Sequence, residues 1–141
     1  ELTCGVIGNE ELVALPVIEI RTARPFFDYR AKYDSSASEE ICPAPIPPEI
    51  AQRAQDASTR AHRALGCRGF SRTDLMWTPS PQGASPHSTP VGPGRLAVLE
   101  VNTIPGMTSN SLLPKAAQVA GIPFAELLER LVRWAMEDRS R

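Results

Sequence analysis

The amino-acid sequence predicts an α+β fold in which an antiparallel sheet is flanked by helices. Two pairs of β-type runs predict the sheet: 2–7 with 13–20, and 68–77 with 96–102. Each pair is joined like a hairpin, so its two strands are expected to run antiparallel. Apolar residues that recur every three or four positions predict the helices, one in the middle of the chain and two at its C-terminal end.

The two N-terminal runs are separated by Gly8-Asn9-Glu10-Glu11, which is typical of a hairpin turn. Pro16 lies inside the second run, and proline lacks the N–H that a central strand donates. This strand is therefore expected to lie at an edge of the sheet or to begin after the proline. Residues 26–38 follow, aromatic first and then small and polar. They predict a long surface loop, a kind of segment that often serves as a functional lid.

The first helix is predicted over residues 48–65, with Gly66 ending it. Its apolar side recurs at intervals of four and three: Ile50, Ala54, Ala57, Ala61 and Ala64. Two more helices are predicted, one over residues 111–120 that stops at Gly121 and a last one with Pro123 in its first turn. The apolar face of the last helix is predicted to comprise Phe124, Leu127, Leu128, Leu131 and Ala135.

Composition excludes several classes of function. Fifteen Lys and Arg residues against 16 Asp and Glu residues leave a formal net charge of −1, so there is no broad basic field for nucleic acid. No apolar run approaches the ~20 residues of a membrane span. Three cysteines without C-x-x-C spacing indicate a reducing cytoplasm rather than a disulfide framework or a zinc site.

The ends and the interior of the chain suggest how it is organised. It begins with Glu1 rather than Met and enters a predicted strand at once, so we expect a piece of a longer protein. Residues 78–95 are rich in proline and cannot pack a core. They predict a flexible excursion at the tip of a hairpin.

Four polar residues on the two longer predicted strands form the first candidate site. Arg72 and Asp74 are two positions apart, as are Glu100 and Asn102, so each pair shares one face of its strand. If those faces point the same way, two carboxylates, an amide and a guanidinium meet. Such oxygen ligands suit Mg²⁺, and the arginine suits a developing negative charge on a phosphate or an oxyanion. Solvated strand ends with surface ion pairs are the alternative.

The segment after these strands supplies a second candidate. Gly106 exposes its N–H without a side chain in the way. Ser109, Asn110 or Ser111 is expected to cap the next helix, whose N-terminus would then be a site for an anion such as a carboxylate. An ordinary capped loop is the alternative.

The remaining candidates are isolated side chains. Lys32 and Tyr33 lie in the predicted loop, where a lysine that closes over phosphate competes with a solvated lysine beside a tyrosine that packs the loop down. His62 and His87 have no neighbouring partners of metal-ligand type and are interpreted as structural or solvent-exposed. The sequence has neither the G-x-x-x-x-G-K-[ST] loop nor the G-x-G-x-x-G loop that bind phosphates.

Two stretches carry a resemblance to a known family: GCRGFSRTD at 66–74 and EVNTIPGMTSNSL at 100–112. Residues 29–33 and 41–45 match as well, in the same order. The chain thereby resembles the D-alanine–D-alanine ligases of the ATP-grasp superfamily, over nearly its whole length outside the proline-rich excursion. The resemblance implies that residues 1–141 form an ATP-grasp C-terminal lobe, without the upstream substrate domain and ATP-gripping region.

The resemblance implies a reaction and a set of residues for it. ATP would phosphorylate the carboxylate of a first D-alanine, and the amine of a second would attack the acyl phosphate, giving D-alanyl-D-alanine for peptidoglycan. Asp74, Glu100 and Asn102 would bind Mg²⁺, with Glu100 bridging two ions that Mn²⁺ could replace. Arg72 and the N–H of Gly106 would form the oxyanion hole.

The other implied residues bind substrates. Ser111 and the N–H of Leu112 would hold the carboxylate of the second D-alanine. The residues implied for the nucleotide and for closure are Lys32 on phosphate, Tyr33 on the substrate side, Glu1 on the ribose hydroxyls, and Phe26, Met76 and Leu99 around adenine.

Three functions therefore compete: a lobe of a D-alanine–D-alanine ligase, a lobe of a ligase that joins D-alanine to D-lactate or D-serine, and a non-catalytic remnant that binds a nucleotide or a partner. The Lys32-Tyr33 pair favours the first, and the retained polar residues argue against the third. We expect the 141 residues alone not to turn over. The full-length protein is expected to be a cytoplasmic homodimer.

Overall fold

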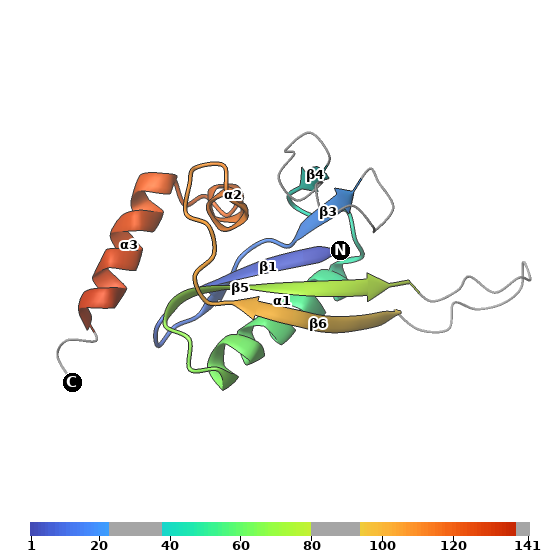
Figure 1. Ribbon diagram of the computed structural model, residues 1–141, viewed down its shortest axis with the longest axis horizontal. Coiled ribbons are helices and arrows are strands. Elements are labelled where there is room, and N and C mark those ends of the chain that lie inside the picture. The colour runs from blue at the N-terminus through green and yellow to red at the C-terminus, as the bar shows by residue number, and fades with distance from the viewer. Residues whose placement is uncertain (23–37, 80–93, 138–141) are drawn as a thin grey trace, which may run out of the picture.

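A computed structural model describes residues 1–22, 38–79 and 94–137 (Figure 1). Its strands form one antiparallel sheet of six strands in the order β4-β3-β1-β5-β6, with β2 also paired to β1. The elements are β1 (Leu2–Gly8), β2 (Val13–Ala14), β3 (Ile18–Thr22), β4 (Ser38–Ile41), α1 (Pro48–Ala64), β5 (Gly69–Thr78), β6 (Arg95–Asn102), α2 (Leu112–Val119) and α3 (Phe124–Glu137). The predicted α+β class with an antiparallel sheet is confirmed.

The predicted strands and helices are present, with two differences at the N-terminal half. The predicted run 13–20 is split into β2 and β3, and β3 begins after Pro16, as one of the two expectations had it. β4 was not predicted, because Ser38-Glu39-Glu40-Ile41 has no apolar alternation. Most of the predicted loop 26–38 and most of the proline-rich segment 78–95 lie outside the described residues.

Strand β1 is the centre of the molecule, and every one of its residues is buried. It pairs with β2 and β3 on one side and with β5 on the other. Helix α1 covers one face of this sheet, and α2 lies on the opposite face (Figure 1). A strand covered on both faces reads as a continuous apolar run rather than an alternating one.

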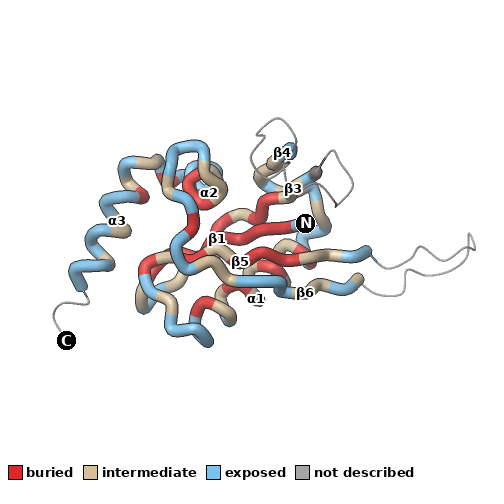
Figure 2. The backbone as a smooth tube through the Cα atoms, in the orientation of Figure 1, coloured by how far each residue is buried: buried red, intermediate tan, exposed pale blue. Residues whose placement is uncertain are grey.

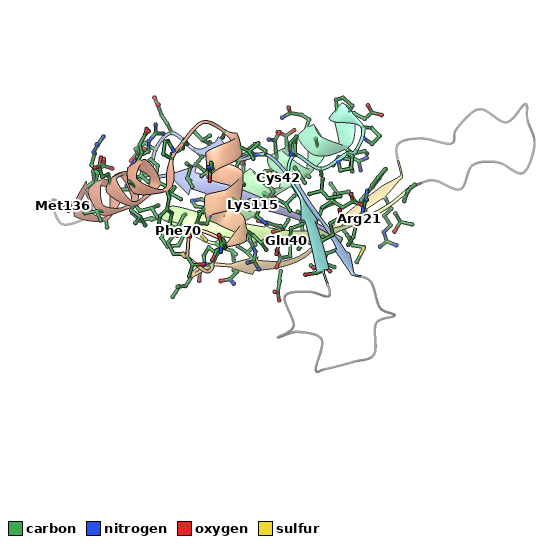
Figure 3. The ribbon with its side chains drawn as sticks, turned by 90° about the horizontal axis from the view of Figure 1, so that it is seen from above. Arg21, Glu40, Cys42, Phe70, Lys115 and Met136 are labelled. Carbon is green, nitrogen blue, oxygen red and sulfur yellow. The ribbon has the colours of Figure 1, made fainter. Side chains whose placement is uncertain are left out.

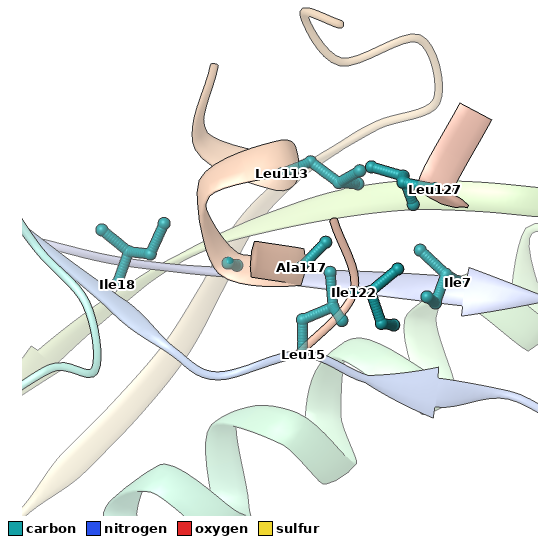
Figure 4. Close-up of a cluster of buried hydrophobic side chains, with 8 residues drawn as sticks. Ile7, Leu15, Ile18, Leu113, Ala117, Ile122 and Leu127 are labelled. Atoms are coloured by element: carbon teal, nitrogen blue, oxygen red, sulfur yellow. The ribbon is translucent and has the colours of Figure 1, made fainter. Parts of the chain in front are cut away.

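Two apolar clusters lie on the two faces of the sheet, and Figure 2 shows the buried residues concentrated along the central strands β1 and β5. The cluster below α1 comprises Leu2, Cys4, Val17, Ile50, Ala54 and Leu75. The cluster below α2 and α3 (Figure 4) comprises Ile7, Leu15, Ile18, Leu113, Ala116, Ala117, Ile122 and Leu127. Burial raises the pKa of the Cys4 thiol to about 12, so Cys4 stays protonated and acts as a small apolar side chain.

The buried face of α1 differs from the predicted one. It comprises Ile50, Ala54, Ser58 and His62, whereas Ala57 and Ala61 are half-buried and Ala64 is exposed. The two polar members have hydrogen-bond partners: Ser58 Oγ donates to the carbonyl of Ala54 at 2.8 Å, and His62 Nδ1 lies 2.7 Å from Ser71 Oγ. A search for apolar spacing misses such residues, since their burial depends on partners elsewhere in the fold.

We expect the free energy of unfolding to fall as the pH drops below 6.5, the ordinary pKa of histidine. Burial lowers the pKa of His62 in the folded chain, so in acid the unfolded chain takes up the proton first and is stabilised by it. The slope reaches at most about 1.4 kcal/mol per pH unit. Urea unfolding between pH 5 and 8 measures it. His62→Gln should flatten this part of the curve, and an unchanged slope would contradict the assignment.

Helix α3 buries less of its apolar side than the spacing predicted. Only Leu127 is buried, Phe124 and Leu131 are half-buried, and Leu128 and Ala135 are exposed. The helix lies at one end of the sheet (Figure 1), so only a narrow stripe of it meets the core. None of the helices in the described ranges combines the length and apolar character needed to cross a membrane.

Candidate active site

Four polar side chains on β5 and β6 share one face of the sheet. Arg72 lies opposite Asn102, and Asp74 lies opposite Glu100 in the antiparallel register. Residues directly opposite each other in such a pair have their Cβ atoms about 4.5–5.5 Å apart and point to the same side. The four side chains were predicted to meet if the two strands pair with these faces on the same side, and the structure shows this arrangement.

Arg72 and Asp74 form the rigid part of this group. The guanidinium donates to both carboxylate oxygens of Asp74, from Nε at 3.0 Å and from a terminal nitrogen at 2.9 Å. The hydroxyl of Thr3, on the neighbouring strand β1, donates to Asp74 Oδ1 at 2.6 Å. Both side chains of the ion pair are largely buried, with 18% and 11% exposure. Two hydrogen bonds from two different nitrogens fix the direction of the guanidinium, so this group is oriented before a ligand binds.

Thr3 is a member of the site that sequence reasoning missed. It is fully buried in β1, opposite Asp74 in the register between β1 and β5. The only signal for it was a hydroxyl residue inside the apolar run Leu2-Thr3-Cys4. That signal has no meaning until the register of the central strand is known, because a shift of one residue would turn Thr3 to the other face.

The residues on β6 are more open to solvent. Glu100 is exposed, and Asn102 is half-buried with its Oδ1 accepting the backbone N–H of Ile104 at 3.0 Å. The pairing is irregular after Asp74: Glu100 is the partner of Asp74 and Val98 that of Leu75, so Leu99 is one extra residue on β6. Such a bulge increases the local twist and re-aims the side chains beside it.

The oxygen donors of this face fit a hard cation. Asp74 Oδ2 accepts one hydrogen bond, Glu100 is exposed, and Asn102 offers an amide oxygen. Mg²⁺ takes one or two carboxylates and completes its octahedron with water and phosphate oxygens. Across 1–22, 38–79 and 94–137, no three His, Cys, Asp or Glu side chains gather as a metal cluster.

The loop between β6 and α2 brings Gly106 beside Ser111. A Cβ added to Gly106 would lie 3.0 Å from Ser111 Oγ, so this approach suits a residue without a side chain. Ser111 is the N-cap residue of α2, one of the three predicted cap candidates, but its side chain does not cap the helix. Its Oγ instead lies 2.8 Å from the hydroxyl of Thr108. The N–H of Leu112 is one of the first-turn amides that have no partner within a helix.

Helix α2 lies on the same face as Arg72. Gly5 is opposite Arg72 in the register of β1 and β5, and a Cβ on Gly5 would lie 3.4 Å from Leu113 Cδ1. The helix thus lies within contact distance of Gly5, and the tighter restriction on a side chain there, 3.0 Å, comes from Leu15 Cδ1. The first turn of α2 therefore lies on the face of the sheet that carries Arg72.

The residues predicted around a nucleotide are described only in part. Glu1 is exposed and Met76 half-buried, and they flank the paired residues Leu2 and Leu75 at one end of the sheet. Leu99 is 55% exposed. Phe26, Lys32 and Tyr33 lie outside the described residues. His62, interpreted as structural or solvent-exposed, is buried on the α1 side of the sheet, and His87 lies outside the described ranges.

The family described as D-ala D-ala ligase C-terminus matches residues 1–133. The chain belongs to this family of ligases. A D-alanine–D-alanine ligase from Syntrophobacter fumaroxidans is 49% identical over 98% of the chain, and one from Methylobacterium radiotolerans is 48% identical over 99%. The chain spans only about 40% of the length of these relatives, 40% and 41% respectively.

Solved structures of D-alanine ligases have the same fold as the chain. A D-alanine–D-alanine ligase from Bacillus anthracis complexed with ATP is 37% identical, with a TM-score of 0.70 over 99% of this chain and 40% of that one. The VanG D-Ala:D-Ser ligase from Enterococcus faecalis is 36% identical, with a TM-score of 0.72 over 94% of this chain and 35% of that one. The ATP-grasp C-terminal fold expected from the resemblance is therefore confirmed.

Proposed function

We propose that the chain is the C-terminal lobe of a cytoplasmic ATP-dependent ligase that makes D-alanyl-D-alanine for peptidoglycan. The observation that carries the proposal is the placing of Arg72, Asp74, Glu100 and Asn102 on one face, beside the N-terminus of α2. The ligase family to which residues 1–133 belong and the relatives' names support the same reaction. Residues 1–141 would act together with an upstream part that binds the first substrate and grips ATP.

Asp74, Glu100 and Asn102 are the residues that would hold Mg²⁺ or Mn²⁺, with Glu100 shared between two ions. When bound, the ions would neutralise the phosphate oxygens of ATP. Asn102 keeps a second lone pair on Oδ1 while it accepts the Ile104 N–H. The Arg72 guanidinium and Thr3 hydroxyl fix the Asp74 carboxylate, so its orientation does not depend on the ligand.

The proposed reaction transfers the terminal phosphoryl group of ATP to the carboxylate of the first D-alanine. The amine of the second D-alanine then attacks the acyl carbon, loses a proton, and phosphate leaves from the tetrahedral intermediate. Arg72 and the N–H of Gly106 would stabilise the negative oxygen of that intermediate. The guanidinium of Arg72 is already oriented by its hydrogen bonds to Asp74, so little reorganisation of this group is needed during the reaction.

The second D-alanine would bind through its carboxylate at the start of α2. The Ser111 hydroxyl and the Leu112 N–H are the proposed donors. Ser111 Oγ does not cap the helix; it accepts the N–H of Thr108 at 3.1 Å, and when the Thr108 hydroxyl donates to it as well, its own proton can be donated to a carboxylate. Pro114, the third residue of α2, has no N–H. A capping hydroxyl of Ser111 could therefore accept a hydrogen bond only from the backbone N–H of the first two helical residues.

The nucleotide is assigned to the end of the sheet that carries Glu1 and Met76. Glu1 would bind the ribose hydroxyls, and Met76 with Leu99 would flank adenine. By the resemblance, Phe26 would join the adenine pocket, Lys32 would reach phosphate, and Tyr33 would close the substrate side. A homodimer of the complete protein is proposed on the same ground.

The decisive experiment joins this chain to the upstream part of the Syntrophobacter fumaroxidans relative. We expect the fusion to release phosphate from ATP in a D-alanine-dependent way and to form D-alanyl-D-alanine, and the 141-residue chain alone to do neither. A fusion that folds and binds ATP without forming the dipeptide would support the remnant hypothesis. Turnover by the isolated chain would overturn the assignment of an incomplete lobe.

A second function has one observation in its favour. The VanG D-Ala:D-Ser ligase matches the fold as well as the D-alanine–D-alanine ligases do, with a TM-score of 0.72. A D-alanine–D-serine or D-alanine–D-lactate ligase is therefore the alternative. Product analysis of the same fusion with D-alanine, D-serine and D-lactate as acceptors decides between them.

A further inference from the structure

An ion pair joins helix α2 to the edge strand β4. Lys115 Nζ lies 2.5 Å from Glu40 Oε2, although the two residues are 75 positions apart in the sequence. The side chains are 37% and 30% exposed, so the pair is partly shielded from water. Viewed from above, Lys115 on the helix and Glu40 on the strand lie close together, with Cys42 beside them (Figure 3).

The surroundings of Lys115 agree with this position. Burial raises the pKa of the Cys42 thiol, and the positive charge of Lys115 acts in the opposite direction. The ammonium group therefore lies near the end of β4, where Cys42 packs against the apolar cluster below α2. At a partly buried place a charge pair is screened less by salt than at an open surface.

The inner face of α2 needs such a contact. It packs on the sheet through the buried side chains Leu113, Pro114, Ala116 and Ala117, with Leu112 half-buried beside them. Apolar burial is not directional, so this packing sets how closely the helix approaches the sheet more strictly than the angle at which it lies. The ion pair to β4 lies on the flank of the helix and supplies a directional contact.

The helix end that carries the proposed substrate contacts is one turn away. The backbone N–H of Lys115 donates to the carbonyl of Ser111 at 2.9 Å, the first hydrogen bond of α2. Ser111 in turn lies against Gly106. A rotation of α2 would displace Ser111 Oγ and the Leu112 N–H together, since the backbone between them and Lys115 is one rigid turn.

We propose that Lys115 and Glu40 are positioning residues for the carboxylate site of the second substrate. Their ion pair fixes the rotation of α2 and thereby the direction of the Ser111 hydroxyl and the Leu112 N–H. This inference rests on the proposed ligase function. Neither side chain is one of the proposed substrate contacts. Because the pair acts only through the orientation of α2, its loss should weaken acceptor binding and leave the binding of ATP unchanged.

The test uses the fusion ligase with Lys115→Met, which keeps the length of the side chain and removes its charge, and with Glu40→Gln. We expect the KM for the second D-alanine to rise about five- to tenfold, with kcat and the KM for ATP within twofold. The exchange K115E/E40K should restore most of the KM. Arg21→Met and Glu39→Gln are the matched controls, because that ion pair joins β3 to β4 without reaching α2.

A second readout does not need activity. In the 141-residue chain, Lys115→Met should speed hydrogen exchange of the hydrogen-bonded backbone amides at positions 115–117 of α2, the first of which donates to Ser111, while Arg21→Met should not. Unchanged exchange and an unchanged KM in an active fusion would overturn the inference and leave the ligase assignment intact. A wild-type fusion without ligase activity would overturn the proposed function and, with it, the substrate role of the pair.

Discussion

Glu100→Gln in the fusion ligase should abolish turnover, with a loss of about 10³-fold or more. Glutamine keeps the shape of the side chain and removes one negative charge from the place where two cations are proposed to bind. Metal ions lower the activation free energy by several kcal/mol, and each 1.4 kcal/mol corresponds to about tenfold in rate. Glu100 is exposed, so the fold should not change. Rate measurements at saturating ATP and D-alanine check the prediction.

Two further measurements separate metal loss from misfolding. The Mn²⁺ affinity of the fusion, measured by electron paramagnetic resonance, should fall with Glu100→Gln, while the thermal unfolding temperature stays the same. Glu129→Gln is the matched control, because Glu129 lies on the exposed side of α3 away from this face. Near-normal turnover by the Glu100 variant would refute the metal assignment.

Arg72→Lys should lower kcat/KM by about 10²–10³-fold, the cost of removing one donor of an oxyanion site. Lysine keeps the positive charge but cannot donate from two fixed nitrogens to both oxygens of Asp74. The positively charged group is then no longer held in one orientation. Of the three hydrogen bonds to Asp74 described above, only the one from the Thr3 hydroxyl remains. Steady-state kinetics with varied D-alanine measures the effect.

A conservative exchange on the surface gives the comparison. Arg60→Lys on the exposed side of α1 should leave kcat/KM unchanged. If Arg72→Lys were equally harmless, charge alone would suffice at this position, and the argument from a pre-oriented guanidinium would fail.

The hairpin of β5 and β6 could be predicted from the sequence because its information is local. Alternation within each strand put Arg72 with Asp74 and Glu100 with Asn102, and the hairpin connection implied that the strands pair. The register that places them opposite each other was left conditional. It depends on the bulge at Leu99, which no spacing rule reveals.

Other parts of the site could not be predicted for physical reasons. Thr3 joins Asp74 through a pairing between strands about 70 residues apart, so no window of sequence contains both. Glu40 belongs to β4, a strand without an apolar pattern that is recognised only by its pairing with β3. His62 and Ser58 are buried polar groups whose partners come from other segments or the preceding turn.

The β5–β6 hairpin separates the connection between its strands from the residues of the candidate site. Thr78 opposite Arg95 is the last pair before the connection, and Arg72 lies six residues back along β5, about 20 Å away at 3.3 Å per residue. The ladder between these points keeps the alignment at Arg72 and Asn102 independent of how many residues join the strands. Evolution can therefore lengthen or shorten this connection at little cost to chemistry, and an epitope or fluorescent label can be spliced in at the same place.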